Sequence, residues 1–286
     1  MTSTGTHLAS PLIPPGWAGV ATCELGEIEP TRGPWRPPFH ALLLATRGHG
    51  TVEVDFAAQT CRPGTLLWIR PGQALRIGAN GLAASVVTFD TKIADATDHL
   101  ADSAPAHWQL EGEDEDAVIS EFAQLSVDCE RHRAGPVAAD LLRHQLAVLL
   151  LRIALLTPAG AALGAEARTF ARFRRRLESG HGQSRRVEDY AEEMGCSVRT
   201  LTRASLAVTG RTAKQVVDDR VALEARRLLA CTPMSVAEVG RHLGFPEPTN
   251  FGRFFHREVG MSPGQFRAET TMNGRSGIPA QRRPAD

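Results

Sequence analysis

The sequence lacks the cysteine patterns that would indicate a disulfide framework or a zinc ribbon. Its five cysteines are scattered, odd in number and include no Cys-x-x-Cys pair. This spacing argues against paired extracellular cysteines and against a zinc site built on cysteine pairs. Unpaired thiols of this kind fit a reducing cytoplasm.

The sequence also has no segment that would direct it into or across a membrane. The first residues show no basic region followed by an apolar region, so no secretion signal is expected. The longest apolar stretch, 141–156, is interrupted by Arg143, His144 and Arg152. Because this stretch is too short and too charged to span a bilayer, we expect a cytoplasmic protein with no membrane partner.

Common catalytic motifs are absent as well. The chain has no nucleotide-binding P-loop, no His-Glu-x-x-His zinc motif and no Gly-x-Ser-x-Gly nucleophile motif. We therefore expect no enzyme activity, no catalytic residue and no cofactor.

Lysine is scarce, with two residues against 30 arginines. Such a bias can come from a GC-rich genome, so the positions of the arginines are more informative than their number. The formal net charge is zero, but residues 1–165 carry a net charge of −7 and residues 166–286 carry +7. A basic C-terminal half is typical of proteins that bind a polyanion.

The length of 286 residues suggests two domains. Residues 1–38 are rich in Pro, Gly and Thr, and we expect them to be irregular. Short β-like runs follow at 40–46, 51–56, 65–69 and 82–89, separated by Gly and Pro-Gly turns. In the second run Val52, Val54 and Phe56 alternate onto one face. Strands at this spacing predict a small barrel or sandwich.

The pattern then becomes helical. Residues 117–133 and 137–156 have the periodicity of two helices, and the second is apolar over most of its surface. Such a helix packs in a core or against a partner, and a homodimer contact is one interpretation. The small residues of 157–167 predict a linker between domains.

Two later stretches repeat one pattern, a short amphipathic run, a Gly-containing turn and a second run carrying Arg. They are VEDYAEEMGCSVRTLTRASLAVTG (187–210) and VAEVGRHLGFPEPTNFGRFFHREVG (236–260). The pattern predicts two helix-turn-helix units, with Gly195 and Gly244 in the turns. Ser197 fits the N-cap of the second helix of the first unit. Ser235 and Glu238 fit a capping box at the start of the second unit.

The second helix of each unit carries side chains that suit base edges in a DNA major groove. Inward residues include Leu201 in the first unit and Phe251, Phe254 and Phe255 in the second. The outward residues at the N-terminal ends are Arg199, Thr202 and Arg203 in the first unit and Thr249, Asn250 and Arg253 in the second. Arg suits guanine, Asn suits adenine and Thr can contact a thymine methyl group.

The helix expected over residues 212–232 joins the two units. Its 21 residues would span about 31 Å, close to the ~34 Å of one DNA turn. Two recognition helices so spaced could enter successive major grooves. A single chain would then read two half-sites.

The predicted fold class is an α+β two-domain protein. A small β-barrel with following helices precedes an all-α domain of two helix-turn-helix units and a linker helix. The predicted boundaries are 1–156 for effector binding and dimerisation, 157–167 for the linker, 168–270 for DNA binding and 271–286 for a disordered tail.

Residues 166–268 resemble the AraC/XylS family of bacterial transcriptional regulators. The most specific part is FGRFFHREVGMSPGQFR (251–267), which is similar to the family's closing signature. The resemblance implies DNA binding through the six outward residues named above. Ala204-Ser205 replaces the usual bulky pair, which predicts looser packing of the second helix of the first unit.

The N-terminal half resembles the cupin-like sensor domain of the same family. Metal-binding cupins carry a His-x-His…Glu set and a later His after a Pro-Gly turn. Here Leu75 stands where the later His would fall, and His40 and His49 are not spaced as His-x-His, so no metal site is expected. The candidate residues for an effector pocket inside the barrel are Arg32, His40, Trp68 and Leu75.

The sequence therefore predicts a DNA-binding regulator of transcription, more commonly an activator in such a family, that senses a small molecule or dimerises. Its partners would be double-stranded promoter DNA, a second copy of the chain, a small-molecule effector and, for an activator, bacterial RNA polymerase. The alternative is a cupin-type enzyme fused to a DNA-targeting helix-turn-helix domain. A helical protein-interaction module without a DNA target is the third interpretation.

Overall fold

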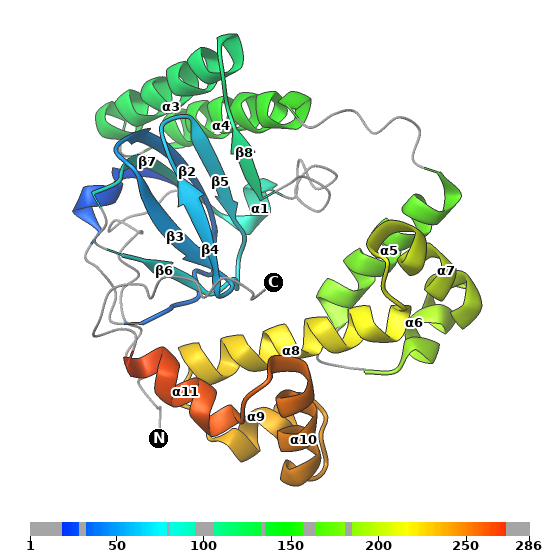
Figure 1. The fold of residues 1–286 in the computed structure, drawn as a ribbon. Helices are drawn as coiled ribbons and strands as arrows, with labels where there is room; N and C mark the ends of the chain where they lie inside the picture. The colour runs from blue at the N-terminus through cyan, green and yellow to red at the C-terminus, as the bar shows by residue number, and fades with distance from the viewer. Residues whose placement is uncertain are drawn as a thin grey trace, which may run out of the picture. The chain divides into compact units, whose positions relative to one another are not determined.

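A computed structural model of the chain describes most of its 286 residues. The described stretches are 19–28, 33–78, 81–94, 106–132, 135–156, 164–180 and 185–272. The chain divides into two compact units, one formed mainly by residues up to Pro158 and the other mainly by residues from Ala159. Figure 1 shows a β-rich first unit and a helical second unit.

The first unit is built on short antiparallel strands. They are β1 (Val20–Glu24), β2 (His40–Arg47), β3 (Gly50–Val54), β4 (Ala57–Cys61), β5 (Thr65–Ile69), β6 (Leu75–Ile77), β7 (Ala83–Phe89) and β8 (His107–Gln109). They form a five-stranded sheet in the order β1-β7-β2-β5-β8 and a three-stranded sheet in the order β4-β3-β6.

The α+β two-domain class is confirmed, but the closed barrel is wrong. In the described part of the chain the strands form two sheets, and no ladder joins them. A barrel needs a continuous ladder around all strands, whereas the turn after β2 carries the chain into the other sheet. Gly48 in this turn has a φ of +76°, and a Cβ there would lie 2.3 Å from the carbonyl oxygen of Gly81. Only glycine fits this position.

Two strand predictions also need correction. The run expected over 51–56 ends at Val54, because Asp55 and Phe56 adopt φ values of +52° and +66° and form the turn into β4. Phe56 therefore does not continue the face of Val52 and Val54. The region expected to be irregular contains β1, which pairs along its whole length with β7.

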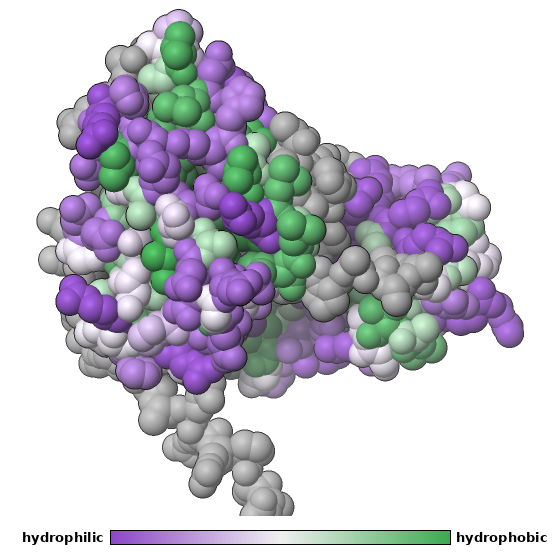
Figure 2. Space-filling view, turned by 90° about the horizontal axis from the view of Figure 1, so that it is seen from above, coloured by the Kyte–Doolittle hydropathy of each residue, from purple (hydrophilic) through white to green (hydrophobic). Residues whose placement is uncertain are grey.

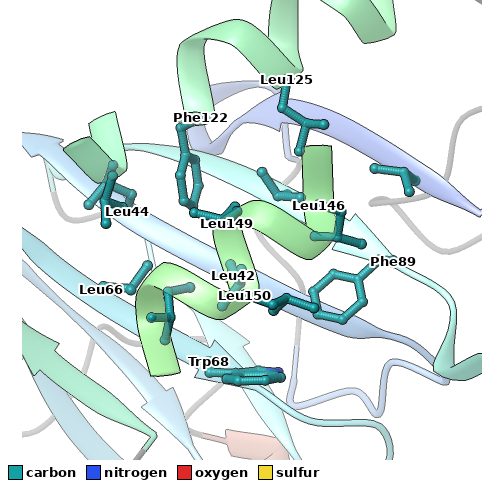
Figure 3. Packing of buried hydrophobic residues seen from close by; sticks show 14 of the residues in the cluster. Leu42, Leu44, Leu66, Trp68, Phe89, Phe122, Leu125, Leu146, Leu149 and Leu150 are labelled. Atoms are coloured by element: carbon teal, nitrogen blue, oxygen red, sulfur yellow. The ribbon is translucent and has the colours of Figure 1, made fainter. Parts of the chain in front are cut away.

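Helices cover one face of the five-stranded sheet. The helical segments of this unit are η1 (Leu25–Glu27, a 3-10 turn), α1 (Thr91–Ala94), α3 (Glu113–Arg131) and α4 (Pro136–Leu156). Figure 3 shows the core between this sheet and helices α3 and α4. The sheet contributes Leu42, Leu44, Leu66, Trp68 and Phe89, and the helices contribute Phe122, Leu125, Leu146, Leu149 and Leu150.

From Ala165 on, the regular elements in the described part of the second unit are all helices. Its helices are α5 (Ala165–Gly180), α6 (Val187–Glu193), α7 (Val198–Thr209), α8 (Ala213–Cys231), α9 (Val236–His242), α10 (Pro248–Val259) and α11 (Pro263–Met272). Helix α8 contacts α6 and α7 as well as α9 and α10, and it runs from one helix-turn-helix pair to the other (Figure 1).

Local sequence signals set the ends of these helices. The Ser197 hydroxyl accepts a hydrogen bond from the Thr200 amide at the start of α7. Ser235 and Glu238 form the predicted capping box at the start of α9. Gly195 and Gly244 have φ values of +65° and +75°, so both take the left-handed turn conformation expected of them.

The predicted linker and tail fall largely outside the described residues. Of the linker 157–167, residues 157–163 are not described, and of the tail 271–286, residues 273–286 are not described. The proposed boundaries at these places remain predictions.

Candidate nucleic-acid interface

The first helix-turn-helix unit packs through the face that its sequence pattern predicts. Val187, Tyr190 and Ala191 of α6 are buried, Met194 is half-buried, and Leu201 of α7 is fully buried. Helix α7 packs through its apolar side on α5 and α8 as well as on α6, which leaves its other side to solvent.

The small pair on α7 is buried rather than loosely placed. Ala204 and Ser205 have exposed fractions of 1% and 0%, and the Ser205 hydroxyl donates to the Leu201 carbonyl oxygen at 2.8 Å. Helix α5 packs closely on α7, and small side chains allow such close approach between helices. The looser packing expected from this pair is not what the structure shows.

The three outward residues of α7 lie in its first two turns. Arg199 and Arg203 are exposed and Thr202 is half-buried. The Arg203 side chain is 70% exposed, with its Nε atom 3.5 Å from a carboxylate oxygen of Glu166. An exposed ion pair of this kind is weak. An anion such as a DNA phosphate can therefore displace the Glu166 carboxylate from Arg203.

The second unit is anchored by aromatic residues. Phe251, Phe254 and Phe255 of α10 are buried, and the Phe245 ring contacts those of Phe251 and Phe254 with centroids 5.4 and 5.0 Å apart. A Cβ on Gly240 would lie 3.1 Å from Phe251, so glycine lets α9 and α10 come close. This packing fixes the orientation of α10.

The outward residues of α10 are exposed in its first two turns. Thr249, Asn250 and Arg253 all have large solvent-accessible fractions. Pro248 occupies the first turn of the helix, a position where its fixed φ is favourable. Both second helices therefore present exposed polar side chains near their N-terminal ends.

A groove of about 590 Å³ lies beside α10. Four cationic side chains line it, from Arg185, Lys214, Arg253 and Arg257. The other lining residues are Asp218, Phe245, Pro246, Asn250 and Phe254. The groove thus includes two predicted DNA-contact residues together with three cations that the sequence did not single out.

Arg185 precedes α6 and reaches the turn of the second helix-turn-helix unit. Its guanidinium donates a hydrogen bond to the Gly244 carbonyl oxygen at 2.9 Å and lies over the Phe245 ring, 3.7 Å from the centroid. Burial lowers the pKa of this guanidinium, which stays charged because the pKa of arginine is far above neutrality.

Asp218 of α8 holds two of the groove cations. The Lys214 ammonium forms an ion pair with its Oδ1 atom, and an Arg257 guanidinium nitrogen lies 3.4 Å from its Oδ2 atom. The Arg257 guanidinium also lies 5.4 Å from the centroid of the Phe254 ring. The carboxylate is nearly buried, while both cations reach solvent.

The sequence held a signal for only one of the three additional cations. Arg257 follows Arg253 by four residues and Asn250 by seven, so all three share one face of α10. Lys214 and Arg185 come from elements distant in sequence, and no local pattern connects them to α10.

The residues suggested for an effector pocket are not all brought together. Arg32 lies outside the described residues. Trp68 donates its indole N–H to His40 Nδ1 at 3.1 Å, and the His40 ring stacks on Phe89 at 5.0 Å. Leu75 is buried in β6 of the other sheet. His40 and Trp68 therefore form one buried cluster with Phe89, whereas Leu75 belongs to the other sheet.

His40 is held in its neutral form. Burial, assisted by the positive charge of Arg70, lowers its pKa from 6.5 to about 4, while Asp90 acts in the opposite direction. An imidazole nitrogen that accepts the Trp68 N–H must also be unprotonated.

Two further properties concern the described residues only. They contain no group of three or more His, Cys, Asp or Glu side chains arranged to hold a metal ion. None of their helices combines the length and apolar character that crossing a membrane requires.

Comparison with known families matches both units. A family described as "AraC-like ligand binding domain" matches residues 19–146, and one described as "Helix-turn-helix domain" matches residues 190–269. Together these matches cover most of the chain.

Curated relatives have similar sequences over part of their length. The "HTH-type transcriptional activator RhaR" of Klebsiella pneumoniae is 30% identical over 162 residues, which is 56% of this chain and 57% of the relative. The "HTH-type transcriptional activator RhaS" of Salmonella paratyphi B is 30% identical over 168 residues, 57% of this chain and 58% of the relative. The match thus spans little more than half of each relative.

Among solved structures, that of ToxT from Vibrio cholerae is similar. It has a TM-score of 0.46 and 10% sequence identity, covering 91% of this chain and 98% of that chain.

Proposed function

Because the chain belongs to the AraC/XylS family of bacterial transcriptional regulators, we propose that it regulates transcription by binding specific DNA sequences. Its helical unit would bind promoter DNA, and its β-rich unit would sense a small molecule. The family evidence points to a regulator rather than to an enzyme, and we propose no catalytic activity.

One observation carries this proposal. Both second helices are anchored on buried apolar residues and present exposed polar side chains near their N-terminal ends. In helix-turn-helix proteins this end of the second helix contacts base edges. The proposed contacts are Arg199, Thr202 and Arg203 on α7 and Thr249, Asn250 and Arg253 on α10.

The connecting helix supports recognition of two boxes. Helix α8 has 19 residues, a length of about 28 Å, which is comparable with the ~34 Å of one turn of B-DNA. We therefore propose that α7 and α10 read boxes about one helical turn apart.

Selection from a random double-stranded DNA pool with the full-length protein tests the function. Enrichment of a motif with two boxes about one turn apart is the expected result. A variant with Arg199→Ala and Arg253→Ala should fail to enrich it, and the control Arg172→Ala, an exposed residue of α5, should enrich it normally. Absence of enrichment with the unmodified chain, with and without cell-extract metabolites as effector source, would overturn the proposal.

Further assignments follow from the family. We propose that the protein acts in the cytoplasm and that, as an activator, it would contact RNA polymerase. We also propose two domains, residues 1–156 and 168–270. Residues 157–167 would join them, and residues 271–286 would form a tail. Limited proteolysis with mass spectrometry tests the boundaries, because fragments ending within 157–167 support them.

The effector site is proposed within the β-rich unit. The match to a ligand-binding domain supports a small molecule as effector, and Arg32, His40, Trp68 and Leu75 remain the candidates. His40 and Trp68 act as one cluster in this proposal because they share a hydrogen bond. A compound that changes DNA affinity of the unmodified chain but not of a Trp68→Leu variant would support the assignment.

Helix α4 carries a feature that supports a homodimer. Its inner side packs in the core, while an outer stripe stays exposed, with Val137 at 81% and Leu155 at 85%. The stripe consists of Val137, Leu141, His144, Val148, Leu151 and Leu155. Its alternating spacing of four and three residues is that of a coiled-coil seam. Hydrophobic residues are visible on this face, seen from above in Figure 2.

The charged residues that flank the stripe are paired within the chain, Asp140 with Arg143 and Arg152 with Glu121. The apolar seam itself would therefore supply the contact between two copies. We therefore propose a two-fold symmetric dimer through this stripe.

Leu151→Glu tests the dimer, because it places a charge in the seam. Sedimentation velocity should show the unmodified chain as a dimer and the variant as a monomer. Glu substitution at Ser120, an exposed residue of α3, is the control and should leave the dimer intact. An unmodified chain that is monomeric at micromolar concentration would contradict the proposal.

A further inference from the structure

The groove beside α10 is rich in positive charge. It is lined by four cationic side chains and a single carboxylate, that of Asp218. Asn250, Arg253 and Arg257 enter it from one face of α10, while Lys214 enters it from α8. The groove is therefore continuous with the proposed base-reading surface but extends to a second helix.

Two cations of the groove reach solvent, although the Arg257 Nε atom also donates to the Glu258 carboxylate at 2.6 Å. The side chains of Lys214 and Arg257 are 58% and 62% exposed, whereas that of Asp218 is only 12% exposed. The carboxylate therefore lies beneath the cations and engages both. Since the Glu258 side chain is also only 17% exposed, an incoming anion would meet the two cations rather than either carboxylate.

We propose that this groove seats a backbone phosphate of DNA beside the box that α10 reads, and that Lys214 and Arg257 bind it. This inference rests on the proposed function and adds contacts that do not read sequence. A helix lying in the major groove is flanked by sugar-phosphate backbones, and at least half of protein–DNA hydrogen bonds go to phosphate and sugar. Lys214 cannot belong to the inserted helix, because it stands on α8.

Asp218 is a positioning residue in this proposal. By pairing with both cations, it restricts their side chains before DNA arrives, so less conformational entropy is lost on binding. Arg185 borders the same groove, but it is only half-exposed and its guanidinium is engaged by the Gly244 carbonyl and the Phe245 ring. The Arg257 side chain, although paired with carboxylates, remains 62% exposed. We therefore assign the phosphate to Lys214 and Arg257.

Salt titration of full-length variants tests the phosphate contact. The duplex enriched by selection and the same duplex with both boxes scrambled serve as probes. Lys214→Gln and Arg257→Gln should each weaken binding roughly 5-fold on both probes and lower the salt slope by about 0.9. Arg172→Gln, the matched control outside the groove, should change neither value.

Neutral linkages identify the phosphate itself. A set of duplexes, each with one methylphosphonate near the box read by α10, is combined with the Arg257→Gln variant in a double-mutant cycle. One linkage should weaken the unmodified chain but leave the variant unaffected. Purely additive losses at every linkage, or unchanged salt slopes for both Gln variants, would overturn the inference. If the unmodified chain enriches no DNA, the proposed function itself has failed.

Discussion

His40 makes the stability of the β-rich unit depend on pH. Its pKa is about 4 in the folded chain against an ordinary 6.5. Between these pH values an unfolded chain binds a proton at this residue and the folded chain does not, so stability is complete above about pH 6.5 and is lost as the pH falls towards 4. Protonation would also break the hydrogen bond from Trp68.

His40→Gln tests this effect, because its side-chain oxygen can still accept from Trp68 but does not titrate. The thermal unfolding midpoint of the unmodified chain should fall more steeply between pH 6.5 and 4 than that of the His40→Gln variant. Parallel curves for the two proteins over this range would contradict the assignment.

Arg253 is the residue at which base reading can be tested most directly. It is exposed on α10 and is proposed to bind a base edge. Arg253→Ala should cost about 1–3 kcal/mol on the selected duplex and relax selectivity at one position of the box. Competition binding with single-base variants of the duplex measures both the loss of affinity and the change in base selectivity. Equal losses on every variant would instead make Arg253 a phosphate contact.

Between elements, Arg185 joins the start of one helix-turn-helix unit to the turn of the other. Arg185→Ala removes the hydrogen bond to Gly244 and the ring contact with Phe245, and should destabilise the helical unit by about 1–2 kcal/mol. Arg185→Lys keeps the charge but lacks the planar fork, so it should recover only part of the loss. Urea unfolding of the unmodified chain and the two variants, all full-length, measures the free energy of unfolding. An Arg185→Lys variant as stable as the unmodified chain would count against the contact of Arg185 with Gly244 and Phe245.

Elements specified by local signals could be predicted from the sequence. The turn glycines Gly195 and Gly244, and the capping box at Ser235, depend on residues a few positions apart, and the structure confirms them. The arrangement of the strands depends on distant pairing. The sequence therefore could not show that the turn at Gly48 leads into a second sheet, and the predicted barrel was wrong.

The same distinction applies to the candidate site. The outward residues of α7 and α10 follow from helical periodicity, so the sequence alone could propose them. Arg185 is 59 residues from the Gly244 carbonyl that it contacts, and Lys214 reaches the groove from another helix. Their places depend on the packing of the whole helical unit, which no local pattern encodes.

For the molecule as a whole, charge is divided between the two halves. Residues 166–286 carry +7 and residues 1–165 carry −7, so electrostatic attraction to DNA comes from the helical half alone. With six to ten phosphate contacts, affinity for the selected duplex should fall on the order of 10³–10⁵-fold from 50 to 200 mM salt. Fluorescence anisotropy across this range measures the slope. A nearly flat response would mean that phosphate contacts are few, and that would argue against two recognition helices engaging the duplex together.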